Sequence, residues 1–285
     1  MEIKEIVLPS INKFASDYVK SLPQVTDFFH YDLKEVKVYE KRYHDLMERY
    51  FNRNELKHTI ETYMNKFGMS EEVKTNLELL RQEDSVVVIG GQQAGLLTGP
   101  LYTIHKVISI IKLAEEKSKL LNKPVIPVFW IAGEDHDIDE VNHVFVEQDN
   151  DFKKKSLYTD YSTKAMISDV VFEQEQMDKW LKEIFLSYEE TVHTKELFER
   201  LRDYSRKSNN YTEFFACIIN NLFARYGLLL IDSADATFRS MQSALFKRLI
   251  LKHKEINAAV AGQQSRIRDF GYSCAITMDE KNANL

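Results

Sequence analysis

The residues best suited to chemistry begin with a glycine-rich run, which holds four of the nine glycines: Gly90, Gly91, Gly95 and Gly99. Glycine lets the backbone approach a bound group closely, and lysine holds a phosphate or carboxylate. The run therefore predicts an anion site, although neither G-x-x-x-x-G-K-[ST] nor G-x-G-x-x-G is present. A tight turn between a strand and a helix is the alternative interpretation. The predicted ligand-binding residues here are Gly91, Gln92, Gln93, Gly95, Thr98, Gly99, Tyr102, His105 and Lys106.

Two acidic runs supply the other candidates. The first contains Glu134, Asp135, His136 and Asp137, and we expect the catalytic groups among these four. The second contributes Asp232 and Asp235 to binding. Such side chains could bind an amine, a sugar hydroxyl or Mg²⁺, or act as a general base.

Each candidate has a structural alternative. Asp135 and Asp137 could cap a following helix. His105 could be a core histidine and Lys106 a solvated lysine. His136 with Asp137 also resembles the His-Asp pair of metal-dependent phosphohydrolases, but suitably placed partner histidines are missing, so no metal site is predicted.

The elements that must position these runs are apolar segments at residues 86–89, 124–132 and 228–232, which predict strands. Residues 86–89 are all β-branched, which predicts a strand buried on both faces. Apolar residues at helical spacing predict a helix from Pro100 to about residue 121, capped by Thr98 or Gly99 and ended by Asn122. Strand, helix and strand form a βαβ unit with parallel strands. Because ligands bind at the carboxyl ends of such strands, we expect the three runs to meet at one rim.

The predicted fold class is therefore α/β, with a doubly wound parallel sheet, a helical N-terminal segment and a helical insertion. We expect a helical segment packing on the core at residues 1–83 and the first part of the α/β core at 84–149. An insertion with amphipathic helices near 173–186 and 194–207 is expected at 150–211. The second part of the core is expected at 212–285.

Composition restricts the class of protein. The 285 residues are 44% hydrophobic and carry a net charge of -6, which argues against a nucleic-acid partner. Two cysteines, Cys217 and Cys274, cannot form a disulfide framework and fit a reducing cytoplasm. We also expect neither a signal peptide nor a membrane span.

At residues 91–106 and 127–137 the sequence closely resembles the cysteine-adding enzyme family of bacillithiol biosynthesis. The pair Asn142-His143 and the strand ending in Asp232 also fit. The resemblance implies a Rossmann-like core similar to class I aminoacyl-tRNA synthetases, interrupted by connecting-peptide insertions. It also implies a C-terminal coiled coil that forms a homodimer. We expect this chain to be the N-terminal half, without the second insertion and the coiled coil.

The resemblance further implies a ligase that joins the carboxyl group of L-cysteine to the amine of glucosaminyl-malate. The carboxylate must first be activated, so ATP or another nucleotide is expected, with Mg²⁺ as a possible companion. The hypothesis places a negatively charged group at the glycine loop with Lys106. Asp135, Glu134 or His136 would orient the amine and take its proton. The alternatives are another nucleotide-dependent enzyme that activates an amino acid, and a chain that binds a ligand without turnover.

Overall fold

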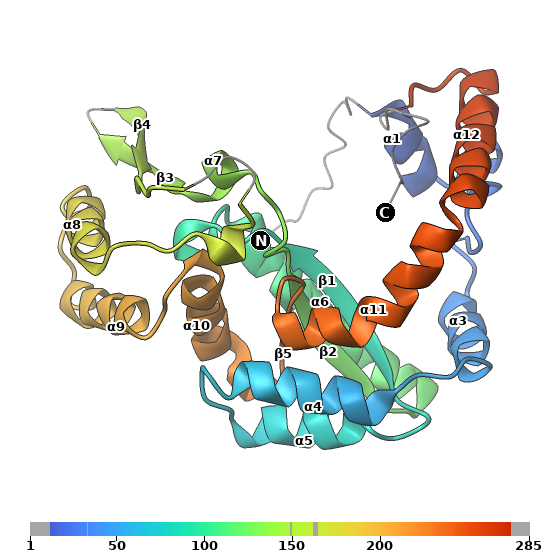
Figure 1. The fold of residues 1–285 in the computed structure, drawn as a ribbon, viewed down its shortest axis with the longest axis horizontal. Coiled ribbons are helices and arrows are strands. Elements are labelled where there is room, and N and C mark those ends of the chain that lie inside the picture. The colour runs from blue at the N-terminus through green and yellow to red at the C-terminus, as the bar shows by residue number, and fades with distance from the viewer. Residues whose placement is uncertain (1–11, 33, 149, 162–164, 275–285) are drawn as a thin grey trace, which may run out of the picture. The chain divides into compact units, whose positions relative to one another are not determined.

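The computed structural model describes residues 12–32, 34–148, 150–161 and 165–274 (Figure 1). The chain divides into two compact units. The larger is Arg49–Met241, and the smaller joins Met1–Glu48 to Gln242–Leu285. Residues 1–11 and 275–285, the ends of the first and last predicted segments, lie outside the described residues.

A parallel sheet forms the centre of the larger unit. Its strands, in spatial order, are β1 (Val86–Gln92), β2 (Val125–Ile131) and β5 (Leu229–Asp232). Helix α6 (Tyr102–Leu121) connects β1 to β2 and packs on both strands. The predicted parallel βαβ unit is therefore confirmed.

Helices cover both faces of this sheet. Phe129 of β2 stacks on Phe215 of α10 (Tyr211–Phe223). The next residue, Trp130, points to the opposite face because side chains alternate along a strand, and it packs edge-on against Phe238 of α11 (Ala236–Leu251). The doubly wound α/β class predicted from the sequence is confirmed.

The first strand differs from its prediction, because it is not buried on both faces. Val87 is 40% exposed and Ile89 is 51% exposed. Strand β1 pairs only with β2 in the described sheet. Helix α4 (Arg53–Met64) packs on β5, and α5 (Glu71–Leu80) packs on β2 and β5 (Figure 1). These two helices thus cover β2 and β5 rather than β1. A run of β-branched residues alone therefore does not predict whether both faces of a strand are buried.

The start of α6 also differs from its prediction. The helix begins at Tyr102, and its N-cap is Leu101, with no side-chain cap. Thr98 and Gly99 therefore do not cap it. They belong instead to a tight loop around the 3₁₀ turn η1 (Leu96–Thr98), where Leu97, Thr98 and Gly99 all have positive φ. At the other end Asn122 adopts the left-handed conformation and ends the helix, as predicted.

Pro127 lies inside β2, in a strand with a neighbour on each side. A proline is unfavourable in a central strand because it lacks the N–H that the ladder uses. The register explains why it is tolerated. Pairing with β5 begins only at Val128, opposite Leu229, so at Pro127 the strand has a partner on one side only, which is Val88.

Residues 132–228 connect β2 to β5. The two predicted amphipathic helices are present as α8 (Gln174–Phe185) and α9 (Thr194–Arg206), which pack together. An antiparallel hairpin, β3 (His143–Gln148) with β4 (Asp151–Ser156), was not predicted. Only Val144 and Val146 alternate in β3, which is too short a pattern to recognise. The remaining short elements are α7 (Ile138–Val141), η2 (Ile167–Asp169) and η3 (Ala224–Tyr226).

The smaller unit is held by aromatic side chains. Phe14 contacts Phe28, Phe29 and Tyr272, and the Tyr272 hydroxyl donates a 2.8 Å hydrogen bond to the buried Asp17. The predicted segment 1–83 is thus divided, because α4 and α5 belong to the larger unit. The helices of the smaller unit are α1 (Lys13–Val19), α2 (Pro23–Thr26), α3 (Val38–Met47), α12 (His253–Asp269) and the C-terminal part of α11.

Among the described helices, none combines the length and the hydropathy needed to cross a lipid bilayer.

Candidate functional site

The register of the sheet brings the three predicted runs together. Gln92 at the end of β1 pairs with Ile131 of β2, and Ile131 pairs with Asp232 of β5. The glycine-rich run and the two acidic runs therefore leave the sheet from adjacent positions at its carboxyl edge. This is the arrangement expected from the rule that ligands bind where parallel strands end.

Lys106 forms the basic side of this edge. Its Nζ donates a 2.6 Å hydrogen bond to Oε1 of Gln92 and a 3.3 Å hydrogen bond to the carbonyl oxygen of Gly91. It also lies 5.2 Å from the centroid of the Tyr102 ring. The Tyr102 hydroxyl accepts a 3.1 Å hydrogen bond from Nε2 of Gln92, which closes the cluster. All of these partners are neutral, so the ammonium keeps its positive charge available to an anion.

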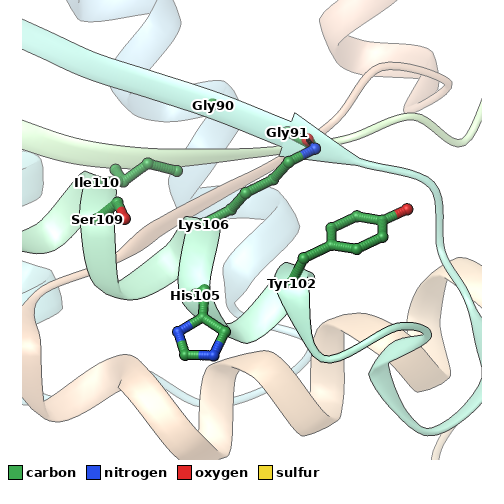
Figure 2. Close-up of a pocket in the computed structure, with 7 residues that line it drawn as sticks. All are labelled: Gly90, Gly91, Tyr102, His105, Lys106, Ser109 and Ile110. Carbon is green, nitrogen blue, oxygen red and sulfur yellow. Dashed lines mark hydrogen bonds between the residues drawn. The ribbon is translucent and has the colours of Figure 1, made fainter. Parts of the chain in front are cut away.

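An open cavity of about 480 Å³ lies beside this cluster. Figure 2 shows Lys106 reaching from α6 to Gly91, with Tyr102 beside it, whereas His105 turns away from the strand. His105 is exposed and is therefore not a core histidine. The lining residues are Gly90, Gly91, Tyr102, His105, Lys106, Ser109 and Ile110.

The loop between β1 and α6 is strained. Thr98 has φ 79° and Leu97 has φ 52°, a region that β-branched and bulky residues rarely adopt. Gly99 follows with φ 66°. A Cβ on Gly95 would lie 2.8 Å from the Cα atom of Gly99, so only glycine fits there without a shift of the backbone. The predicted glycines thus shape this loop, and the side chains of the half-buried Gln92 and the exposed Tyr102 and Lys106 lie around it.

Gln93 points to the acidic side, in contrast to its neighbour Gln92. Its Nε2 donates to Oδ2 of Asp135 at 2.7 Å and to Oε2 of Glu140 at 2.5 Å. One amide nitrogen therefore lies between two carboxylates. Gln93 thus links the end of β1 to the acidic loop that follows β2.

Asp135 organises that loop. Its Oδ1 accepts hydrogen bonds from the backbone N–H groups of His136 at 2.7 Å and Asp137 at 3.2 Å. Burial raises the pKa of Asp135, but the hydrogen bonds from Gln93, Asp137 and His136 outweigh burial and lower it below its ordinary value. Asp135 is thus ionised at neutral pH. It shapes the turn before α7, as the capping alternative suggested, while Oδ2 contacts Gln93.

His136 and Asp137 lie on the surface of the same loop. His136 is exposed, and its Nδ1 lies 3.8 Å from Oδ1 of Asp135. Asp137 occupies the N-cap position of α7 but makes no side-chain capping bond. Both groups therefore face solvent and are accessible to a ligand.

Asp232 is buried, with 4% of its surface exposed. Its Oδ1 accepts a 2.9 Å hydrogen bond from the Ala234 N–H. A Cβ on Gly133 would lie only 2.2 Å from the same oxygen, so the absence of a side chain there admits the carboxyl group. Burial raises the pKa of Asp232 to about 6 against the hydrogen bonds that it accepts, and the negative charges of Asp235 and Glu134 raise it further.

Two more predicted acids have separate partners. Glu134 is exposed, and its carboxylate contacts the Ser233 hydroxyl. Asp235 accepts hydrogen bonds from the N–H groups of Thr237 at 3.0 Å and Phe238 at 3.1 Å. Asp235 therefore caps the first turn of α11, a structural role that the sequence analysis did not consider for this residue.

A Mg²⁺ site requires several converging oxygen ligands. Within the described residues no group of three His, Cys, Asp or Glu side chains is arranged to hold a metal ion. The carboxylates of Asp135 and Glu140 already share the Gln93 amide. The described carboxylates at this edge are therefore not arranged to bind Mg²⁺.

Glu140 and Ser233 at this edge were not predicted from the sequence, and neither was the buried Tyr63. Glu140 belongs to the acidic run, and its place one helical turn beyond Asp137 was the available signal. Ser233 lies between two predicted aspartates and contacts Glu134. Tyr63 lies on α4, and its hydroxyl is buried without a hydrogen-bond partner. No local pattern distinguishes Tyr63 from an ordinary core tyrosine.

Comparison with known proteins shows the family of this chain. A relative from Bacillus cytotoxicus is 43% identical over 272 residues, which cover 95% of this chain and 50% of its own length. One from Bacillus cereus (strain B4264) is 44% identical over the same shares, and one from Bacillus pumilus (strain SAFR-032) is 40% identical over 100% of this chain and 53% of its own. Each is named "Putative cysteine ligase BshC".

The chain thus spans about half the length of these curated relatives. A family model described as "Bacillithiol biosynthesis BshC, N-terminal Rossmann-like domain" matches residues 1–285. The predicted Rossmann-like core and the predicted match to an N-terminal half are confirmed. The chain belongs to the BshC family of bacillithiol biosynthesis, and it comprises the N-terminal Rossmann-like domain.

Proposed function

We propose that this domain supplies the substrate-binding edge of a ligase that joins the carboxyl group of L-cysteine to the amine of glucosaminyl-malate. Family membership gives the reaction class, and the names of the relatives give the amino acid. One structural observation supports the proposal most directly. The sheet register sets a basic cluster and an acidic loop at adjacent strand ends, as a reaction between a carboxylate and an amine requires.

The basic side binds the negatively charged group. Lys106 supplies a charged donor, and Tyr102 and Gln92 supply neutral donors beside an open cavity. The group bound there is a phosphate of ATP, or of another nucleotide, or the malate carboxylate. ATP would convert the cysteine carboxylate into an acyl-adenylate with release of pyrophosphate, or into an acyl-phosphate with release of ADP. The proposal does not involve a protein-bound Mg²⁺, because the described carboxylates are not arranged to bind one.

The acidic side receives the amine. The amine attacks the activated carbonyl carbon and loses a proton. The leaving group is the nucleoside monophosphate from an acyl-adenylate, or inorganic phosphate from an acyl-phosphate. Asp135 is ionised at neutral pH and lies beside the exposed His136, so either group can take that proton. Glu134 orients the amine from the neighbouring position.

The test uses the full-length protein with Lys106→Ala and Asp135→Asn. We expect each change to lower the yield of bacillithiol, measured by mass spectrometry, by at least about tenfold. Lys112→Ala is the matched control, because Lys112 lies on the same helix and pairs only with Glu115 among the described residues. Unchanged yield in both site variants would remove the assignment.

ATP–pyrophosphate exchange with a panel of amino acids tests the identity of the substrate. Exchange that depends on L-cysteine supports this reaction by way of an adenylate. Exchange with another amino acid alone would favour a different amino-acid-activating enzyme. Binding of ATP without exchange or product would favour a non-catalytic role.

The proposed compartment is the cytoplasm, and the proposed assembly is a homodimer. A reaction that handles the free thiol of cysteine suits a reducing cytoplasm, and Cys217 and Cys274 are both free thiols. The coiled coil and the homodimer implied by the resemblance would lie in the half of the relatives that this chain does not cover.

A further inference from the structure

The outer edge of β1 is unpaired in the part of the sheet that the structure describes, where β2 is its only neighbour. The Val86 N–H and the Gln92 carbonyl oxygen both form hydrogen bonds to residues that flank β2. Backbone groups alternate in direction along a strand that pairs in parallel. The backbone groups of Val87, Ile89 and Gly91 therefore point outward, away from β2.

Part of this edge is already protected. Lys106 donates a hydrogen bond to the outward carbonyl oxygen of Gly91 (Figure 2). Charged side chains, lysine above all, commonly protect strand edges from pairing with another chain. Val87 and Ile89, in contrast, are exposed apolar residues on the same edge. The N-terminal part of the edge thus remains open to a further strand.

The exposed side chains of Val87 and Ile89 also share one face of the sheet. A Cβ on Gly90 would meet Ile110 of α6, so Gly90 faces this helix. Because side chains alternate along a strand, Val87 and Ile89 lie on the opposite face. Helix α6 crosses from β1 to β2, and crossovers between parallel strands are right-handed. A right-handed crossover that led away from β1 in the other direction would lie on the opposite face, over Val87 and Ile89.

The strand order indicates one kind of partner. From β1 the parallel strands follow in one direction only, to β2 and then to β5. In the doubly wound order 3-2-1-4-5-6 the first strand is central, and a fourth parallel strand pairs with its other edge. About half of the Bacillus cytotoxicus relative lies outside the match to this chain, and that half is long enough to supply such a strand.

We propose that the open edge of β1 pairs with a parallel strand from the half of the relatives that this chain does not cover, and that a helix next to that strand covers Val87 and Ile89. A second copy of this chain would have to pair antiparallel, because a two-fold axis relates the two identical edges. The docking surface goes beyond the proposed ligase reaction and does not depend on it.

The same pairing would complete the cavity beside Lys106. All of the residues that line this cavity come from β1 or α6. In doubly wound sheets the ligand binds in the crevice where the strand order reverses, which here is the point between β1 and the added strand. The loop after the added strand would therefore form the opposite wall of the anion site. This consequence, unlike the docking surface, rests on the proposed function.

Amide hydrogen exchange, resolved to single residues by mass spectrometry, tests the pairing in intact proteins. In the 285-residue chain we expect fast exchange at Val87, Ile89 and Gly91 and slow exchange at Val86 and Val88. In the full-length Bacillus cytotoxicus relative the equivalent strand should be protected throughout. Fast exchange at its outward positions would overturn the proposal. Slow exchange at the outward positions of the 285-residue chain would also overturn it, since the edge would then already be covered.

Two substitutions at Ile89 test the surface itself. Ile89→Pro removes an outward N–H that the pairing with β2 does not use, and Ile89→Lys places a charge on the face to be covered. The 285-residue chain is co-expressed with the remaining half of the same relative. We expect an equimolar complex, which each Ile89 variant weakens at least about tenfold. Leu186→Lys is the matched control, because Leu186 is an apolar residue that is 86% exposed at the end of α8.

Equal retention of the second half by the wild-type chain and both Ile89 variants would overturn the docking surface, and so would failure of the wild-type chain to retain it. A homodimer of the 285-residue chain that Ile89→Lys abolishes would assign the edge to a second copy instead. Calorimetric titration with ATP separates this inference from the proposed function. Tighter binding by the complex than by the chain alone, lost in Lys106→Ala, supports the completed cavity. Absence of ATP binding in both would count against a nucleotide at the anion site and leave the docking surface standing.

Discussion

The two sides of the site stand on strands that differ in burial. Strand β1 carries the basic side, and its residues Val87 and Ile89 are 40% and 51% exposed. The acidic side follows β2 and β5, and all four residues of β5, which ends in Asp232, are buried. One side of the site is therefore attached to an open edge of the described sheet, and the other is part of the core.

Because of this difference, substitutions on the two sides should differ in how they affect ligand binding and folding stability. Lys106 and Tyr102 are exposed, so a ligand reaches them without disturbing the core. Asp232 is a buried carboxyl group whose charge is unfavourable in the unliganded protein. Changes on the basic side should affect ligand binding more than folding, whereas changes on the acidic side should affect both.

The largest expected effect compares two isoleucines. Ile231 of β5 is 7% exposed and Ile89 of β1 is 51% exposed. Ile231→Ala should lower the free energy of unfolding by about 2–4 kcal/mol, because it leaves a cavity in the core. Ile89→Ala should lower it by about 1 kcal/mol or less, because solvent already reaches that side chain. Urea denaturation of both variants measures the difference, and equal losses would show that β1 is covered as fully as β5.

Asp232→Asn should have a smaller effect, and one of opposite sign. The pKa of Asp232 in the native state is about 6, above the ordinary value of 3.8, so the native state binds this proton more tightly than the unfolded chain does. The stabilisation from the protonated form is complete below about pH 4 and is lost as the pH rises from 4 to 6. At pH 8 the wild-type chain therefore carries the full cost of the charge.

We expect Asp232→Asn to raise the free energy of unfolding at pH 8 by about 1–3 kcal/mol, since the asparagine oxygen can still accept from Ala234. The gain should fall to about half at pH 5. Denaturation curves at the two pH values measure it. A loss of stability at pH 8 would mean that a cation already pairs with the Asp232 carboxylate in the free protein.

Lys106→Ala tests the basic side. We expect affinity for ATP, or for glucosaminyl-malate, to fall about tenfold to thirtyfold, because one charged hydrogen bond is lost. The free energy of unfolding should change by less than about 0.5 kcal/mol, as is usual for a surface position. Calorimetric titration and denaturation of the same samples provide both values. A large loss of stability with unchanged affinity would contradict this prediction, because Lys106 would then contribute to folding rather than to ligand binding.

The sequence predicted the features that depend on local patterns of residues. Apolar runs bounded by glycine, proline and acidic residues located β1, β2 and β5, and the carboxyl-end rule then placed Lys106, Asp135 and Asp232 at one edge. Burial was less predictable. Whether Ile89 is covered depends on where α4 and α5 pack, and although these helices directly precede β1 in the sequence they pack on β2 and β5 instead.

The partners within the site were the least predictable. Gln92 and Gln93 were assigned to one binding run, yet they point to opposite sides, because successive side chains at the end of a strand alternate in direction. Tyr63 lies on α4, which packs on β5, and no spacing rule connects this helix to Asp232, which comes 169 positions later. The division into two units was also hidden, since α11 continues through the boundary at Gln242 without a helix-breaking residue.

The smallest expected effect tests whether these two glutamines act separately. Gln93→Ala removes the amide that lies between Asp135 and Glu140, so the pKa of Asp135 should rise, because its main stabilising hydrogen bond is lost while burial remains. The free energy of unfolding should fall by about 1 kcal/mol or less. Gln92→Ala removes a partner of Lys106 and should leave the Asp135 titration unchanged. Carbon-detected NMR titration of the carboxyl group measures both. If Gln92→Ala moves the pKa of Asp135 as far as Gln93→Ala does, the basic and acidic sides form one electrostatic unit, and a ligand on either side would then change the charge state of the other.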